Sequence, residues 1–124
     1  MTEIKSFRDL HVWQNAMDIV TDVYNLTSKF PASEQFGLTS QMRRAAVSIP
    51  SNIAEGKHRG TRKDYRQFLL IAFGSIAELE TQLEISKRLK YINPDGYEDM
   101  LIRLQELSRM QNRLIDSLSK KPST

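Results

Sequence analysis

The sequence predicts an all-α protein, an antiparallel up-down-up-down four-helix bundle. Three observations carry this prediction: long segments with apolar residues three and four apart, breaks at only a few prolines and glycines, and no segment with the alternation typical of a strand. The chain has 124 residues, with 5 glycines and 4 prolines. This length suits one domain, so we expect a single bundle over residues 1–124, ordered over about 7–118 and flexible over 119–124.

The first helix is expected to begin near Phe7 and to end before Pro31, since the residue before a proline is driven out of the helical region. Ser6 and Asp9 resemble a capping box that satisfies free N–H groups at the helix start. The apolar face of this segment is wider than contact with one helix requires. Trp13 is therefore interpreted as an anchor of the core.

The second helix is expected from about Leu38 to Glu55, with Pro50 in its interior. Proline lacks the N–H that a helix interior needs, so a kink is expected there. Four polar residues surround the proline: Ser48, Ser51, Asn52 and Glu55. They either satisfy carbonyls that Pro50 leaves free or form a buried polar cluster with a function, and the first interpretation is the simpler.

Two glycines, Gly56 and Gly60, bracket the short segment 57–59. A glycine just past a helix is the usual left-handed cap, so this segment is expected to link two helices. Thr61 then opens the third helix, with Asp64 in the capping-box position.

The third helix is expected to run to about Tyr91, with its main apolar stripe at Tyr65, Leu69, Ala72, Ile76, Leu79, Leu83 and Ser86. Residues 68–77 in it are apolar on nearly every side. In a monomeric bundle one side of each helix faces water. Either another subunit covers this segment, or its small residues pack tightly inside one subunit. A fourth helix is expected to start with Asn93 as cap and Pro94 at its first position, and to fray after Leu118.

The composition excludes several classes of protein. Hydrophobic residues make up 40% and charged residues 27% of the chain, as in ordinary globular proteins. The absence of cysteine excludes disulfides, zinc-thiolate sites and cysteine nucleophiles. No apolar run has the length of a signal peptide core or a membrane span, so we expect a cytoplasmic protein without a membrane partner.

Positive charge is concentrated in one part of the chain. The formal net charge is +3, but residues 35–66 alone carry seven Lys or Arg and two acids. Such a segment suits contact with a polyanion. It also suits helices of opposite charge that pack together, and the sequence leaves both interpretations open.

The strongest candidates for an anion-binding site lie around the expected start of the third helix. Arg62 and Lys63 fall in its first turn, where the helix dipole disfavours cations by about 0.3–1 kcal/mol each. Free N–H groups at a helix start bind phosphate well. The candidate phosphate contacts are Arg43, Arg44, Lys57, Arg59, Arg62, Lys63 and Arg66.

No pattern in the sequence indicates an enzyme. The two histidines, His11 and His58, lack the spacing of metal ligands, and there is no phosphate-binding glycine loop or nucleophile motif. Glu78, Glu80 and Glu84 are interpreted as an ion-paired helix surface. We therefore expect no catalytic residue, no metal and no cofactor.

Several runs resemble the four helix bundle protein family, a bacterial family that includes proteins encoded in intervening sequences of large-subunit ribosomal RNA genes. These runs are LHVW at 10–13, EQFGL at 34–38, QMRRAAVSIPSNIAEG at 41–56 and AFGSIAELE at 72–80. The resemblance implies an antiparallel bundle that assembles as a ring-shaped homopentamer. It also implies likeness to the accessory protein of diversity-generating retroelements, which associates with a reverse transcriptase and nucleic acid. It implies no catalytic residue.

The sequence thus predicts a non-enzymatic, homo-oligomeric protein that binds RNA or DNA through backbone phosphates. The alternative is an oligomeric scaffold that binds a protein partner and makes no direct contact with nucleic acid.

Overall fold

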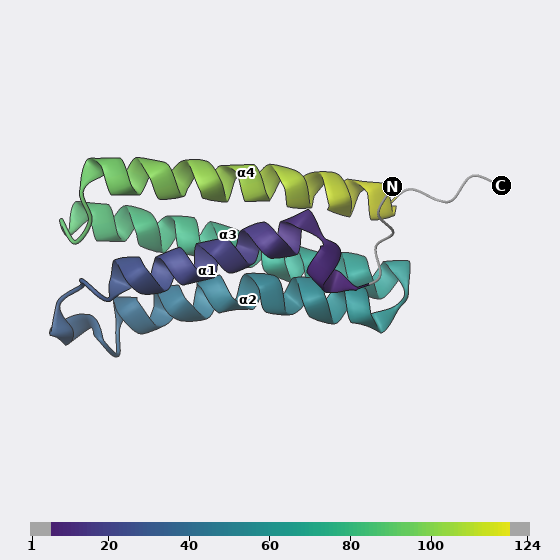
Figure 1. Ribbon diagram of the computed structural model, residues 1–124, viewed down its shortest axis with the longest axis horizontal. Helices are drawn as coiled ribbons and strands as arrows, with labels where there is room; N and C mark the ends of the chain where they lie inside the picture. The colour runs from purple at the N-terminus through teal and green to yellow at the C-terminus, as the bar shows by residue number, and fades with distance from the viewer. Residues whose placement is uncertain (1–5, 120–124) are drawn as a thin grey trace.

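The computed structural model describes residues 6–119 and contains four long helices (Figure 1). They are α1 (His11–Thr27), α2 (Leu38–Arg59), α3 (Arg62–Arg88) and α4 (Pro94–Ser119). The helices lie along the long axis of the molecule, and successive helices run in opposite directions. The predicted four-helix bundle is confirmed, and residues 6–119 contain no strand. Of the tail expected over 119–124, Ser119 is the last residue of α4, and 120–124 lie outside the described residues.

The start of the chain differs from the prediction in one respect. Ser6 and Asp9 do form a capping box, but it caps a short 3-10 turn, η1 (Phe7–Asp9). Leu10 is extended, with φ −78° and ψ 128°, so α1 begins at His11 rather than near Phe7. Trp13 is only partly buried, and its ring meets that of Phe7 edge-on at 5.3 Å. It packs at the margin of the core instead of anchoring its centre.

Helix α2 is longer than predicted, and the expected cap at Gly56 is wrong. The helix continues through Pro50 and Gly56 to Arg59, and Gly60 with φ +87° is the left-handed residue that ends it. Gly56 is buried against α3 instead. A Cβ at this position would lie 2.8 Å from Cβ of Phe68 and 3.2 Å from the carbonyl oxygen of Tyr65. The glycine is therefore needed for the close approach of two helices.

The polar residues around Pro50 form local hydrogen bonds. The Asn52 side-chain amide donates to the Ser48 carbonyl at 2.8 Å, and the hydroxyls of Ser48 and Ser75 lie 2.9 Å apart. Ser51 is exposed. These bonds join α2 to itself and to α3, and they give no separate buried polar cluster.

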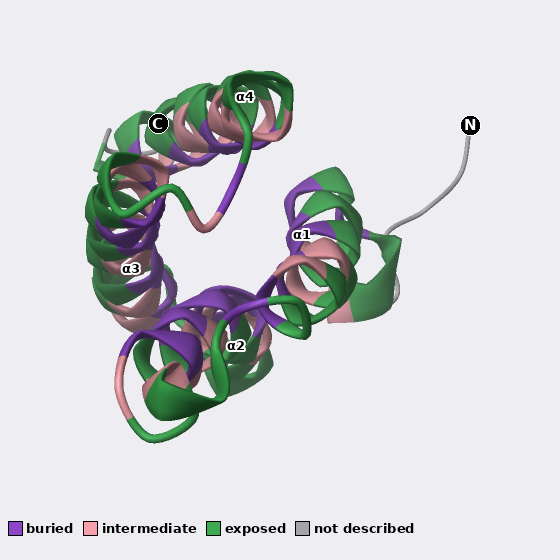
Figure 2. Ribbon diagram, turned by 90° about the vertical axis from the view of Figure 1, so that its left-hand side faces the viewer, coloured by how far each residue is buried: buried purple, intermediate pink, exposed green. Residues whose placement is uncertain are grey.

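The core is formed by one stripe from each helix, and the buried positions face the interior (Figure 2). The predicted stripe of α3 is buried throughout: Tyr65, Leu69, Ala72, Ile76, Leu79, Leu83 and Ser86. The helix ends at Arg88, before the expected Tyr91, because the chain turns at Lys90 with φ +64°. Pro94 begins α4 as predicted, and the Asn93 side chain accepts from the Gly96 N–H at 2.7 Å.

Figure 2 shows an arc in which α1 borders α2 and α4 borders α3, with α1 and α4 at its two ends. An ion pair between Arg103 and Asp22 joins these two helices. Gln111 on α4 is fully buried, yet neither polar atom of its amide has a hydrogen-bond partner within residues 6–119. No helix among the described residues is both long enough and apolar enough to cross a bilayer.

We expect Gly56→Ala to lower the free energy of unfolding by about 1–3 kcal/mol, because the new methyl group meets the backbone and Cβ atoms of α3. Urea denaturation measures this change. The control is Ser51→Ala on the exposed face of the same helix, which gains helix propensity without a clash. A Gly56→Ala variant as stable as this control would contradict the packing role of the glycine.

Candidate nucleic-acid interface

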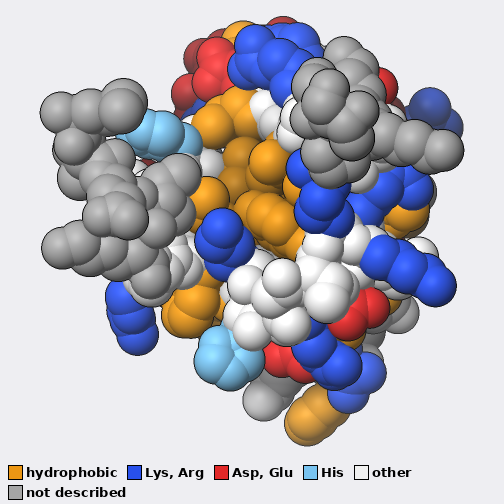
Figure 3. Space-filling model, turned by 90° about the vertical axis from the view of Figure 1, so that its right-hand side faces the viewer, with side chains coloured by type: hydrophobic (Ala, Val, Ile, Leu, Met, Phe, Trp, Pro, Cys, Tyr) orange, Lys and Arg blue, Asp and Glu red, His pale blue; other side chains and the backbone are white. Residues whose placement is uncertain are grey.

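The up-and-down topology brings four helix ends together at one end of the bundle. Helix α2 ends and α3 begins there, and the start of α1 and the end of α4 lie at the same end (Figure 1). Seen from this side, Lys and Arg side chains surround an apolar centre (Figure 3). Charged residues far apart in the sequence therefore share one surface.

Five of the seven predicted phosphate contacts lie at this end, and we call their surface the basic end: Lys57, Arg59, Arg62, Lys63 and Arg66. Arg43 and Arg44 do not join it. They precede Lys57 by 13 or 14 residues of continuous helix, which is about 20 Å along the axis. The seven cations thus do not form one patch.

Lys57 and Arg59 fall in the last turn of α2, and not in a loop as predicted. Cations are favourable at that end of a helix dipole, so their position alone indicates no ligand. Arg59 is also engaged: its Nη2 lies 2.8 Å from Oε1 of Glu55, and both side chains are about half exposed. An exposed pair of this kind is weak, so the pairing restricts Arg59 without burying it.

Arg62 holds two helices together. Its Nη2 donates to the Ser117 carbonyl at 3.1 Å, so a side chain from the start of α3 satisfies an acceptor in the last turn of α4. Arg66, one turn further along α3, is half-buried, and its Nε has no hydrogen-bond partner within residues 6–119. Both cations lie at the basic end, but both also belong to the packing of α3.

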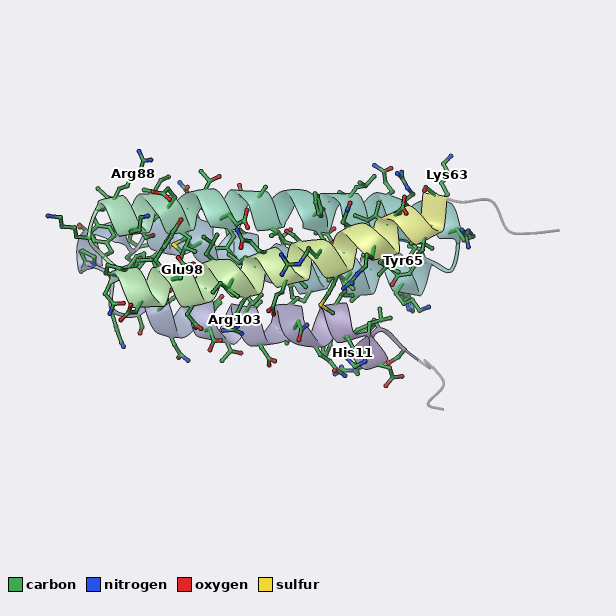
Figure 4. All side chains as sticks on the ribbon, turned by 90° about the horizontal axis from the view of Figure 1, so that it is seen from above. His11, Lys63, Tyr65, Arg88, Glu98 and Arg103 are labelled. Carbon is green, nitrogen blue, oxygen red and sulfur yellow. The ribbon has the colours of Figure 1, made fainter. Side chains whose placement is uncertain are left out.

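Lys63 points outward at the start of α3 (Figure 4) and makes no ion pair or hydrogen bond within the described part of the chain. The ammonium of Lys57 lies 5.5 Å from the centre of the Tyr65 ring. Thr61 caps α3 as predicted, its hydroxyl accepting from the Asp64 N–H at 3.1 Å. Lys57 and Lys63 are therefore the cations of this surface with the fewest ties to the rest of the bundle.

A hollow of about 230 Å³ opens beside these lysines, between the α2–α3 connection and the end of α4. Its walls include Tyr65, Leu118 and the two glycines 56 and 60, with Lys57 at its side. Sequence reasoning missed this feature. The helix order was the signal that could have found it, because it places the end of α4 beside the start of α3.

Arg43 has a structural role away from the basic end, near the start of α2. Its Nε donates to the Thr27 hydroxyl at 2.9 Å, and its guanidinium lies 4.5 Å from the centre of the Tyr24 ring. Both partners belong to α1, so Arg43 joins α2 to α1. Arg44 is exposed on the neighbouring surface.

The opposite end of the bundle carries an ion-paired network around Glu84. Glu84 accepts from Arg88 at 2.9 Å and from the Tyr97 hydroxyl at 2.8 Å. These bonds hold the pKa of the Glu84 carboxyl below its usual range and raise that of the Tyr97 hydroxyl. Glu84 is thus ion-paired as predicted. Within residues 6–119, no three His, Asp or Glu side chains gather as a metal site would require.

Comparison with known proteins gives a family and a fold. The family model described as 23S rRNA-intervening sequence protein matches residues 8–113. The chain is also similar to a crystal structure from Bacteroides thetaiotaomicron, a protein of unknown function from the S23 ribosomal protein family. The two share 24% sequence identity with a TM-score of 0.76, over 84% of this chain and 97% of that chain. No curated protein matches the sequence.

We expect Arg43→Met to lower the free energy of unfolding by about 1–2 kcal/mol, because it removes a charged hydrogen bond and a cation–π contact with α1. The matched control, Arg44→Met, should change it by less than about 0.5 kcal/mol. Thermal and urea unfolding of both variants measure the difference. Equal effects in the two variants would show that Arg43 does not hold α1 in place.

Proposed function

Since this chain belongs to the 23S rRNA-intervening sequence protein family, we propose that it is a non-enzymatic RNA-binding protein that contacts backbone phosphates through the basic end. The observation that carries the proposal is the gathering of Lys57, Arg59, Arg62, Lys63 and Arg66 around the start of one helix. Arg62 and Lys63 lie where a helix dipole disfavours cations, so a bound anion would stabilise that end of α3.

Contacts to phosphates fix the position of a protein on nucleic acid but carry little sequence information. Lys57 and Lys63 are the contacts to which we assign most of the binding, because they make no ion pair within residues 6–119. Arg59 and Arg62 contribute from fixed positions, since Glu55 and the Ser117 carbonyl already orient their side chains. Binding of this kind falls steeply as salt rises, because each neutralised phosphate releases counterions.

We expect Lys57→Glu/Lys63→Glu to weaken binding to a structured RNA and to reduce the slope of log affinity against log salt by about 1.4–1.8, the share of two phosphate contacts. Fluorescence anisotropy between about 50 and 200 mM salt measures both quantities. The control is Lys29→Glu/Lys90→Glu, which makes the same change of net charge at the opposite end of the bundle. Equal losses of affinity in the two double variants would indicate a general effect of net charge. Unchanged binding in Lys57→Glu/Lys63→Glu would show that the basic end is not the binding site.

The same measurement with a duplex DNA of the same sequence shows whether binding depends on ribose rather than deoxyribose.

A second candidate function is a homo-oligomeric scaffold without direct contact to nucleic acid. Phe36 is 91% exposed, and it borders a groove of about 600 Å³ on α1 and α2 together with Val47 and Arg44. A comparable groove on α3 and α4 is lined by Glu80, Glu84 and Ile85. The first groove is lined by Arg43 and Arg44 and the second by Glu80, Glu84 and Arg88, so copies of the chain can join head to tail through contacts between unlike charges, the type of contact that closes a ring.

The apolar segment of α3 supports this second candidate. Ile71 is 47% exposed, and Gly74 has no described atom within 4 Å of where a Cβ would be placed. A glycine inside a helix costs about 1 kcal/mol relative to alanine, and no close contact within residues 6–119 of one chain requires it. A second copy of the chain packed closely against α3 would explain why a glycine is present at position 74. Such packing agrees with the homopentamer that the family resemblance implies.

Light scattering of the purified protein is expected to give a mass near five times the 14.3 kDa of one chain. Phe36→Ser should shift the mass toward the monomer, because it removes the most exposed large apolar side chain of the groove on α1 and α2. Met17→Ser, a substitution of a less exposed apolar residue on α1, is the control and should leave the mass unchanged. A monomeric mass for the unmodified protein would contradict the proposed oligomeric assembly.

A further inference from the structure

The two grooves on the sides of the bundle lie at the same level along its axis. The groove on α1 and α2 extends from Tyr24, in the last turn of α1, to Ser48, halfway along α2. The groove on α3 and α4 begins at Ala77, includes residues near the end of α3, and extends into the first turns of α4 as far as Leu101. Both grooves therefore lie in the half of the bundle that is farther from the basic end (Figure 1). They lie on different sides of it, because α1 and α2 form one half of the arc and α3 and α4 the other (Figure 2).

The apolar residues of the two grooves are complementary. Phe36 precedes α2 and is 91% exposed, so this large aromatic side chain projects from the first groove and packs against almost nothing in its own chain. The second groove contains an exposed isoleucine, Ile85, and a half-buried leucine, Leu101. An aromatic side chain gains most from burial when it enters an apolar depression of this kind.

The charges of the two grooves are complementary as well. Arg44 in the first groove is exposed, and it makes no ion pair or hydrogen bond within residues 6–119. Glu80 in the second groove likewise has no such partner among these residues, whereas its neighbour Glu84 is held by Arg88. Burial raises the pKa of the Glu80 carboxyl, so its surroundings disfavour an unpaired negative charge. A guanidinium from another chain would supply the missing partner.

We propose that Phe36 and Arg44 of one copy dock into the groove on α3 and α4 of the next copy, and that the basic ends of neighbouring copies thereby form one composite RNA-binding surface. Copies in a closed ring are related by rotation about one axis, and rotation leaves the height of a point along that axis unchanged. Bundles can therefore stand along the ring axis only if both contact surfaces of a copy have the same height, as these two grooves do. Every basic end then faces the same side of the ring.

This inference rests on the proposed function and adds that one copy carries only a part of the RNA site. Packed helices lie about 8–10 Å apart, so two bundles side by side, each two helices wide, place their basic ends about 20 Å apart. An RNA duplex several times longer than this spacing reaches at least two basic ends. Each copy that it reaches adds about 1.4–1.8 to the slope of log affinity against log salt through Lys57 and Lys63.

The decisive variant is Glu80→Lys, which sets two cations against each other at the contact between copies. We expect light scattering to show a mass near that of one chain. We expect the affinity for a long RNA duplex to fall about 100-fold, because binding through two linked sites is lost. The salt slope should fall by at least about 1.4–1.8, the share of one copy. This variant raises the net charge of the chain by two, so a general effect of charge would strengthen binding instead.

The matched control is Arg44→Glu/Glu80→Lys, which exchanges the two charges and leaves the net charge of the chain unchanged. It should restore the mass, the affinity and the salt slope of the unmodified protein. A double variant that remains monomeric would overturn the pairing of Arg44 with Glu80 and with it this inference. So would a monomeric Glu80→Lys variant that binds RNA with the original affinity and slope.

A distance measurement tests the arrangement of the basic ends directly. The natural sequence has no cysteine, so Lys63→Cys introduces one site for a spin label on each copy. Pulsed electron paramagnetic resonance should give a distance between neighbouring labels below the length of α3, which is about 40 Å. A longer distance, or a monomeric unmodified protein that still binds RNA, would overturn this inference and leave the proposed function standing. Failure of the unmodified protein to bind RNA would overturn both.

Discussion

The close contact between α2 and α3 is the constraint on which the rest of the structure depends. Gly56 permits it, since any side chain at this position would meet Phe68 and the backbone at Tyr65. Contact at this point lets α2 continue to Arg59 and turn within Gly60 and Thr61 into α3. A wider separation would need a longer connection and would move Lys57 away from Lys63. The charged surface and the hollow therefore both follow from the absence of one methyl group.

The contact between α2 and α3 also explains how several cations can lie near the start of α3. Within a sharp helix–helix connection, the last turn of α2 and the first turn of α3 lie side by side, so the carbonyl end of one dipole stands near the N–H end of the other. The two fields partly cancel for a charge placed between them. Lys57 benefits from the first helix, and the penalty on Arg62 is reduced by its bond to the Ser117 carbonyl. Local stability and exposure of positive charge are thus compatible at this end of the bundle.

The sequence predicted the fold class, the number of helices and the stripe of α3, because a regular apolar spacing over many residues depends only on helix geometry. Sequence patterns that involve only neighbouring residues were right, as with the capping box at Ser6, the N-cap at Thr61 and the start of α4 at Pro94. They failed at Gly56, where the same residue type serves either as a left-handed cap or as a site of close packing. Only a contact with Phe68, twelve residues later, decides between these roles.

The candidate site was predictable only where its residues are close together in the sequence. Charge counting found Lys57 and Lys63, which lie in one short stretch of sequence. It could not separate them from Arg43, whose partners Thr27 and Tyr24 belong to another helix. Nor could it find the hollow, since Tyr65 and Leu118 meet only through the packing of α3 against α4. Positions of residues were readable from the sequence, but their partners across the bundle were not.

The wall contributed by Leu118 has a consequence for biosynthesis. Translation delivers Lys57, Arg62 and Tyr65 well before the last turn of α4, so a nascent chain can expose its cations while the hollow still lacks one side. The hollow is completed only when α4 docks, which makes it a property of the finished polypeptide rather than of its emerging fragments.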